Sequence, residues 1–422
     1  MALSRTNYMD ASVYVAGRRA EFRLPADAVL KPNMRLLNVG LISGAAADAY
    51  NPLTGAYGII ESIQLFDGGQ VLDQDLDFSR YAGLKNALHS NEDNTSNTNF
   101  LAKSELGYAA VGPSGFAVNG DDALFPRIST GPEMAFETNT VPGVGATDLQ
   151  KEQQWAWLDL RACLGFLGQS VVVPTSLYQH LRLVINYKDV ATLRREGIIE
   201  DTAKNFTYAQ PFLCYETIEG DAAAQFAREY KGVSFNALET AVVNLPAQAA
   251  GGPQERSYNI TGFDDKYVEK MMLINEPLSS ATYRNGALTL GFGSQGSVAQ
   301  SAQSLQLSIN GRNIFPQNIT GRMNRLAMTT DSWGPINISF AQNYKGVADE
   351  AQALSTECQN RVGDLDYTGF WLRDVVRDLK LTYARTAINA EAKLHQALNL
   401  RLMGVIRKAV VAQDGSYRVM YV

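Results

Sequence analysis

Hydrophobic residues alternate with other residues in several short segments of the chain. Leu37, Val39 and Leu41 lie two positions apart, and the same spacing recurs in 305–309 and in 398–402. A period of two puts successive apolar side chains on one face of an extended segment, as a half-buried β-strand requires. The pattern therefore predicts a chain built mainly from β-strands.

Turn residues lie between these segments. The Asp-Gly-Gly of 67–69 and the Asn-Gly of 310–311 each separate two apolar runs. Asp-Gly and Asn-Gly accept the positive φ angles of tight turns, so both segments predict β-hairpins. The stretch 397–422 predicts two further strands, joined at 414–415.

Helical signals are few and short. The segment 221–230 (DAAAQFAREY) begins with Asp, contains an alanine run and is followed by Gly232, which predicts a short helix. The segment 387–397 is a second candidate, with Glu391 and His395 four residues apart. Both are expected to connect strands rather than to form a bundle.

The order of these signals repeats along the chain. Four segments of the first half match four of the second in the same order: 21–39 with 257–275, 62–65 with 304–307, 181–183 with 400–402, and 208–218 with 417–422. Colinear repetition favours a duplicated β domain. The first copy is expected at 21–218 and the second at 233–422, with a connecting helix at 219–232.

Composition limits the possible functions. The chain has 422 residues and a net charge of −6, with only three His and three Cys. Mild acidity argues against a dedicated DNA or RNA binder, and so few His and Cys argue against most metal or thiol chemistry. No signal peptide or transmembrane run is recognised, and the odd cysteine count suits a reducing, cytosol-like compartment.

Two motifs suggest a chemical function, and neither completes its pattern. The glycines of 291–296 fit a phosphate-binding fingerprint, but no helix or correctly spaced acid follows. Asp73, Asp75 and Asp77 mimic the start of a calcium loop that lacks its later Gly and Glu, so they are expected to be solvated or to meet a basic neighbour. We therefore predict no catalytic residues, no metal and no cofactor.

Aromatic residues are candidates for packing or for contacts between subunits. The region 88–153 is rich in Gly, Asn and Pro, and is either a set of exposed loops or a disordered insert; its scattered aromatics favour ordered loops. Trp rarely lies on a surface without a partner. The candidate interface residues are Trp155, Trp157, Trp371, Phe100, Tyr108 and Phe116.

Six segments carry a likeness to a known family: 36–42, 59–73, 157–161, 174–187, 304–315 and 398–422. Their strands, turns and spacing, together with the duplication, resemble the double jelly-roll major capsid proteins of tailless icosahedral DNA viruses. The likeness is to the virophage, polinton-like and giant-virus-related members. It covers most of 20–422 but includes no diagnostic motif.

The resemblance implies an all-β fold of two tandem eight-stranded antiparallel jelly rolls, with short connecting helices and long loop inserts. Residues 1–20 would be an N-terminal arm. The protein would act as a structural major capsid protein, not an enzyme, and would form homotrimers with a pseudo-hexagonal outline.

The implied partners are neighbouring capsomers, penton proteins and minor capsid or cement proteins, with an internal membrane left open. The resemblance implies no sequence-specific nucleic-acid binding and no small-molecule substrate. It places the protein in the virion, after synthesis and assembly in the host cytoplasm or nucleus.

Two alternatives use the same β-rich pattern. A carbohydrate-binding, fibre-like or adhesin-like β-sandwich would place loop aromatics in an exposed groove. A β-sandwich hydrolase would need clustered carboxylates in a cleft. A jelly roll alone does not define a function. The structural role is favoured by the missing catalytic constellation and by the duplication.

Overall fold

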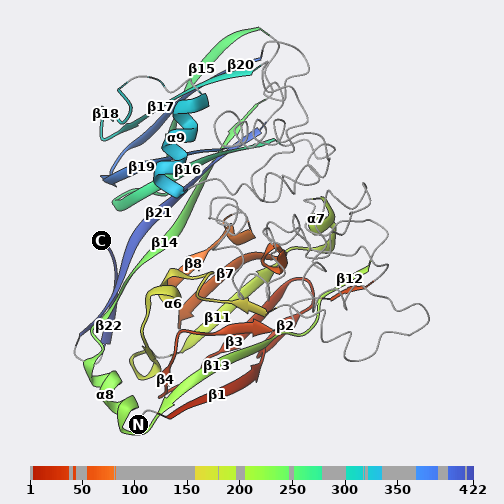
Figure 1. The fold of residues 1–422 in the computed structure, drawn as a ribbon, viewed down its shortest axis with the longest axis vertical. Helices are drawn as coiled ribbons and strands as arrows, with labels where there is room; N and C mark the ends of the chain where they lie inside the picture. Colours follow the sequence, from red (N-terminus) through yellow and green to blue (C-terminus); the bar gives the residue numbers. More distant parts are fainter. Residues whose placement is uncertain are drawn as a thin grey trace, which may run out of the picture.

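The computed structural model describes residues 3–37, 41–43, 55–79, 81, 157–178, 180–195, 205–246, 251–277, 301–316, 318, 322–334, 367–387, 398–413 and 416–422. These residues form two antiparallel β-sandwiches, one above the other in Figure 1. The described part of the chain contains no helix long and apolar enough to cross a membrane.

The first sandwich has two main sheets. One contains β10 (Val173–Pro174), β4 (Val29–Leu30), β13 (Phe212–Glu219), β5 (Arg35–Leu37), β9 (Trp157–Asp159) and β1 (Leu3–Asp10). The other contains β2 (Val13–Val15), β3 (Arg19–Arg23), β11 (Leu181–Tyr187), β7 (Ile60–Asp67) and β8 (Gln70–Asp75). A separate pair is formed by β12 (Asn205–Thr207) and β6 (Leu41–Ser43).

The second sandwich also has two sheets. One contains β14 (Gly232–Leu245), β21 (Leu398–Gln413), β16 (Lys266–Pro277), β19 (Tyr367–Val376) and β22 (Ser416–Tyr421). The other contains β15 (Gly251–Ile260), β20 (Leu379–Ala387), β17 (Ser301–Ile309) and β18 (Arg312–Asn313).

The helical segments of the described residues are short. They are η1 (Gly55–Ile59), α6 (Gly165–Gln169), η4 (Thr175–Leu177), α7 (Val190–Arg195), α8 (Asp221–Glu229) and α9 (Arg322–Trp333). The predicted helix at 221–230 is confirmed as α8, which lies between β13 and β14. The candidate helix at 387–397 lies almost entirely outside the described residues.

Strand pairing shows that the two sandwiches are copies of one arrangement. Six antiparallel pairs recur in the same order: β1–β13 as β14–β21, β3–β11 as β15–β20, β11–β7 as β20–β17, β7–β8 as β17–β18, β5–β13 as β16–β21, and β5–β9 as β16–β19. Eight strands of the first half thus correspond to eight of the second. The predicted duplication of an eight-stranded antiparallel unit is confirmed.

Two of the four sequence matches align with the wrong strand. Leu183 pairs with Phe22 and Leu65, and its counterpart Leu381 pairs with Tyr258 and Leu307. The partner of 181–183 is therefore 379–381, not 400–402. A Leu-basic-Leu pattern occurs in both β20 and β21, so the short motif could not distinguish these two consecutive strands, which belong to different sheets.

The closing strand of the second copy was also assigned wrongly. β13 corresponds to β21, because each pairs with the first strand of its copy. β22 is an additional strand that pairs with the far end of β21, from Lys408 to Gln413. In the sheet it takes the place beside β21 that β4 has beside β13, although β4 comes early in its copy and β22 comes last.

The N-terminal residues do not form an arm that leaves the fold. Leu3–Asp10 is β1, which pairs along its whole length with β13 and corresponds to β14 in the second copy. The expected arm at 1–20 is therefore wrong for these residues. Backbone hydrogen bonding to β13 holds β1, although its described side chains are exposed or half-buried.

Both predicted hairpins are present. Gly68 has a φ of 57° in the turn between β7 and β8, and Asn310 and Gly311 have φ of 52° and 75° between β17 and β18. The alternation in 305–309 is confirmed as well, since Leu305, Leu307 and Ile309 are buried. Their side chains belong to an apolar core that runs without interruption through both sandwiches.

Candidate functional site

The two sandwiches meet along a seam, which we define as the contact of α6 and β8 with β14 and β21. Figure 1 shows β14 and β21 running down from the second sandwich beside the first. Phe166 of α6 packs edge-on against Phe235 of β14, with 5.7 Å between ring centroids. Gly165 lies so close that a Cβ there would be 1.9 Å from Asn236 O. The seam is therefore packed backbone against backbone.

Three carboxylates lie in a row at this seam. Asp73 and Asp75 are two residues apart on β8, so their side chains face the same side of the strand, and Asp77 lies in the bend that follows. Asp73 Oδ2 accepts a hydrogen bond from Phe166 N at 2.8 Å. Asp77 accepts two 2.8 Å hydrogen bonds from the guanidinium of Arg401 on β21.

The expectation that these three carboxylates are solvated is wrong for Asp73 and Asp75. Asp73 and Asp75 are 1% and 2% exposed. Only Asp77 met the expectation of a basic neighbour directly, through Arg401. Asp75 accepts a hydrogen bond from Asp77 N through Oδ1, while its Oδ2 has no hydrogen-bond partner within the described part of the molecule.

Burial changes the acidity of this row. It raises the pKa of Asp73 to about 6, against the hydrogen bond from Phe166 N and the attraction of Lys408. It raises the pKa of Asp75 well above the usual range, and the charges of Asp77 and Asp73 add to the effect. Ionising these groups at the seam is unfavourable because a buried carboxylate loses its hydration.

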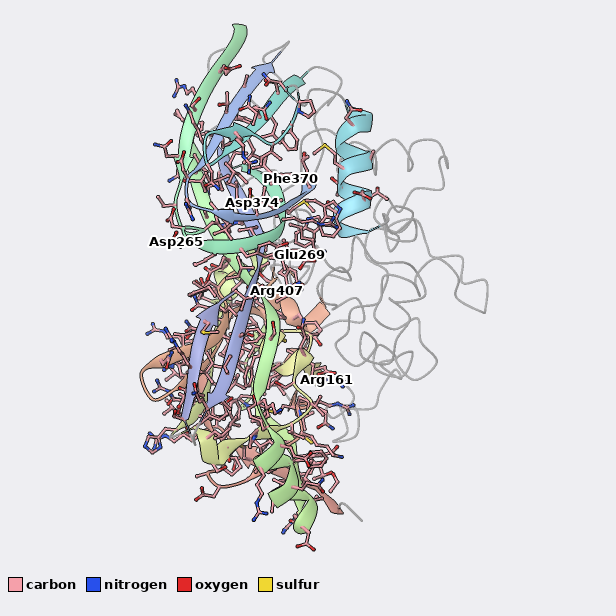
Figure 2. All side chains as sticks on the ribbon, turned by 90° about the vertical axis from the view of Figure 1, so that its left-hand side faces the viewer. Arg161, Asp265, Glu269, Phe370, Asp374 and Arg407 are labelled. Atoms are coloured by element: carbon pink, nitrogen blue, oxygen red, sulfur yellow. The ribbon has the colours of Figure 1, made fainter. Side chains whose placement is uncertain are left out.

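The C-terminal hairpin of β21 and β22 fastens the second sandwich to the first. Tyr417 donates a hydrogen bond from its hydroxyl to Asp67 Oδ2 at 2.7 Å, across the two sandwiches. Its ring lies 4.8 Å from that of Tyr178. In Figure 2 this hairpin lies in front of the first sandwich, below the labelled Glu269 and Arg407, and Arg161 is farther down.

The end of β22 is held by charges of its own sandwich. The Nζ atoms of Lys266 and Lys408 lie 5.1 and 5.3 Å from the ring centroid of Tyr421. Both lysines also face Glu239, at 3.2 and 3.9 Å. Cation–π contacts and the shared carboxylate therefore keep the strand in place beside β21.

Replacing Tyr417 with phenylalanine tests this fastening. The change removes the hydroxyl and leaves one oxygen of the buried Asp67 without that donor. We expect the free energy of unfolding to fall by about 1 kcal/mol, since a single hydrogen bond contributes about this much. Urea unfolding of the purified chain measures it. Tyr421→Phe, at an exposed tyrosine of the same strand β22, is the control: it keeps the ring beside Lys266 and Lys408 and should leave stability unchanged.

Trp371 is the one candidate interface residue whose side-chain contacts the structure describes. Its Nε1 donates to Asp331 Oδ2 at 2.9 Å, and the guanidinium of Arg373 lies 4.1 Å from its ring. Arg373 has a φ of 52°, where the register of β19 shifts against β16. Trp371 thus lies between β19 and α9, in contacts within its own chain.

A neighbouring lysine joins the same cluster. Lys270 Nζ lies 4.4 Å from the ring of Trp333 and donates to Ser332 O at 3.1 Å, in the last turn of α9. A cation at a helix C-terminus is favourable because carbonyl groups there lack partners. Burial lowers the pKa of this lysine.

The other candidate aromatics are placed only in part. Trp157 is in β9, which corresponds to β19, the strand of Trp371. Trp157 and Trp371 belong to different sandwiches and are not brought together. Trp155, Phe100, Tyr108 and Phe116 lie outside the described residues, as do the insert 88–153 and the glycines 291–296.

Sequence reasoning missed the residues that close the seam. Phe166 and Phe235 belong to no motif, and Arg401 and Tyr417 belong only to the repeated segments 400–402 and 417–422. The period-two spacing of the three aspartates was the available signal. In the described ranges, no group of three or more His, Cys, Asp or Glu could hold a metal ion. Cys163 is buried.

Solved structures provide a comparison for the whole arrangement. PBCV-1 VP54, fitted into a reconstruction of the virophage Sputnik, matches with a TM-score of 0.59 and 11% identity, covering 100% of this chain and 98% of that one. The mavirus major capsid protein matches with a TM-score of 0.51 and 8% identity, covering 99% and 90%. The chain has the double jelly-roll fold.

The Faustovirus major capsid protein shares this double jelly roll, with a TM-score of 0.50 and 7% identity over 98% of this chain and 91% of that one. No family model and no curated protein matches the sequence. At 7–11% identity, the likeness establishes the fold. The predicted fold class is thereby confirmed.

Proposed function

We propose that this protein is a structural major capsid protein, the building block of an icosahedral virion shell. The observation that carries the proposal is the duplicated eight-stranded unit, whose fold is similar to capsid proteins over nearly the full length of both chains. The protein acts by assembling and not by catalysis, and it is located in the virion.

The proposed assembly is a homotrimer with a pseudo-hexagonal outline. Two similar sandwiches per chain give three subunits six similar corners, and a closed ring of three needs one heterologous contact repeated three times. The jelly rolls are proposed to extend over 21–218 and 233–422, with β1 added to the first. The aromatic residues Trp155, Phe100, Tyr108 and Phe116 are proposed to lie at subunit contacts.

Further partners follow from the same role. Neighbouring capsomers, penton proteins and minor capsid or cement proteins are the proposed contacts in the shell, with an internal membrane as an additional one. Assembly is proposed to take place in the host cytoplasm or nucleus. The net charge of −6 suits a shell that leaves direct genome contact to other components.

Light scattering coupled to size-exclusion chromatography tests the proposal. We expect a particle of about 138 kDa, three times the 46.1 kDa of the chain, with a pseudo-hexagonal outline in electron micrographs. A monomer that persists at micromolar concentration would contradict the trimer. Specific glycan binding by such a monomer would instead support the carbohydrate-binding alternative.

A further inference from the structure

Two arginines face each other at one end of the first sandwich. Arg23 on β3 and Arg182 on β11 are directly paired in the antiparallel register. Side chains at such positions have Cβ atoms about 5 Å apart, and like charges placed there repel. The arrangement costs stability unless an anion lies nearby.

The carboxylates of the surrounding strands are already engaged. Glu21 pairs with Arg19 at 2.9 Å and with Arg182 at 3.3 Å, so one acid serves two guanidinium groups. Asp67 accepts from His180 N through Oδ1 and from Tyr417 through Oδ2. Within the described residues, the guanidinium of Arg23 has no carboxylate partner.

Both arginines open onto a cavity of about 370 Å³. His180, which directly precedes β11, joins them on its wall. Leu24, Leu181 and Tyr178 supply apolar lining, and none of the lining residues carries a carboxylate. The cavity is positive in a chain whose net charge is −6.

We propose that this cavity binds a phosphate group. Two guanidinium groups and an imidazole offer donors from several directions, which suits a tetrahedral oxyanion, and guanidinium groups match phosphate oxygens in pairs. The charge of two arginines is balanced by a phosphate dianion better than by a single carboxylate. The group is carried either by free phosphate or by the head of a phospholipid.

The site lies beside the fastening of the two sandwiches. Tyr178 lines the cavity and contacts the ring of Tyr417, while Gly68 of the wall follows Asp67, which accepts the hydroxyl of Tyr417. A bound phosphate would hold β3, β11 and the β7–β8 turn together at this point. Binding therefore stabilises the first sandwich where the second is attached to it.

Thermal unfolding of the full chain in increasing inorganic phosphate, at ionic strength held constant with chloride, tests the proposal. We expect a saturable rise in Tm for the wild type and at least about a tenfold weaker apparent affinity for Arg23→Gln. Without phosphate, Arg23→Gln should be as stable as the wild type or more so, because it removes the repulsion from Arg182.

Arg18→Gln is the matched control, since Arg18 is exposed in the turn before β3 and does not line the cavity. It should respond to phosphate like the wild type. The proposal would be overturned if phosphate raised the Tm of all three proteins equally, or if chloride raised it as much as phosphate, and if the vesicle experiment below also showed no binding. A lipid head group is identified as the source if the wild type sediments with phosphatidic acid vesicles but not with phosphatidylcholine vesicles. Arg23→Gln should then fail to sediment with the phosphatidic acid vesicles.

Discussion

Replacing Gly165 with alanine is expected to lower the free energy of unfolding by roughly 3 kcal/mol, the upper part of the usual range for overpacked sites. The added Cβ would lie 1.9 Å from Asn236 O and 2.9 Å from Asn236 C. Both are backbone atoms of β14, so no side-chain rotation can relieve the overlap. The helix α6 must move away from β14, and the contact of Phe166 with Phe235 is lost with it.

The same substitution should alter how the protein unfolds. One continuous apolar core joins the sandwiches, so the wild type is expected to unfold in a single cooperative transition. With the seam forced open, calorimetry should show a broadened or divided transition. Gly69→Ala is the control, because a Cβ there meets nothing within 4 Å. Stability of Gly165→Ala within about 0.5 kcal/mol of the control would show that the seam is not closely packed.

Asparagine at position 75 should make the protein more stable at pH 8 and leave it unchanged at pH 4. Asp75 is buried, its Oδ2 lacks a hydrogen-bond partner among the described residues, and burial raises its pKa well above the ordinary 3.8. Asparagine has nearly the same shape, keeps the acceptor for Asp77 N and carries no charge. We expect a gain of about 2 kcal/mol at pH 8, the scale of an unsatisfied buried polar group.

The direction of this pH dependence follows from the pH at which the carboxyl of Asp75 loses its proton in the folded and in the unfolded state. Below about pH 3.8 the carboxyl is protonated in both states and its burial is least unfavourable. Above that pH the unfolded chain loses the proton first, so this group lowers stability until the pH exceeds the raised pKa. Asp73 acts in the same direction between 3.8 and about 6.

Other carboxylates change stability with pH in the opposite direction, so the measurement must be the difference in unfolding free energy between wild type and variant at each pH. Hydrogen bonds from Lys31, Ser4 and Asn33 lower the pKa of Glu216 to about 2, and its contribution is lost as the pH falls from 4.5 to 2. Urea unfolding of wild type and Asp75→Asn from pH 4 to pH 8 isolates Asp75. Asp10→Asn, exposed on β1, is the control. A variant less stable than the wild type at pH 8 would contradict this account.

Local patterns predicted much of the fold because they depend on near neighbours. The turns at Gly68 and Asn310 need only their own φ angles, and the alternation of Leu305 and Leu307 reports one buried face. The order of strands was harder. Leu-basic-Leu occurs in both β20 and β21, and only pairing with Tyr258 and Leu307 shows which of them corresponds to β11.

Two features had no local signal. The residues of β1 show no apolar alternation, and the strand is placed by backbone pairing with β13 and by polar side-chain hydrogen bonds, from Ser4 to Glu216 and from Asn7 to Thr217. The burial of Asp73 and Asp75 depends on α6 and β21, which are distant in sequence. Spacing could place the three carboxylates on one side of a strand, but the cations they meet are more than 300 residues away, as with Asp77 and Arg401.

The position of β21 late in the chain has a consequence for biosynthesis. Residues 3–219 contain every strand of the first sandwich, so this half can pair its strands while the ribosome is still translating the second. Yet Arg401, Lys408 and Tyr417 come last, and until they emerge Asp77, Asp73 and Tyr178 lack the partners that β21 and β22 supply. A nascent first sandwich is therefore a folded intermediate that β14 can cover early, through Phe235, but whose acidic row stays open to chaperones or to a wrong neighbour until translation is nearly finished.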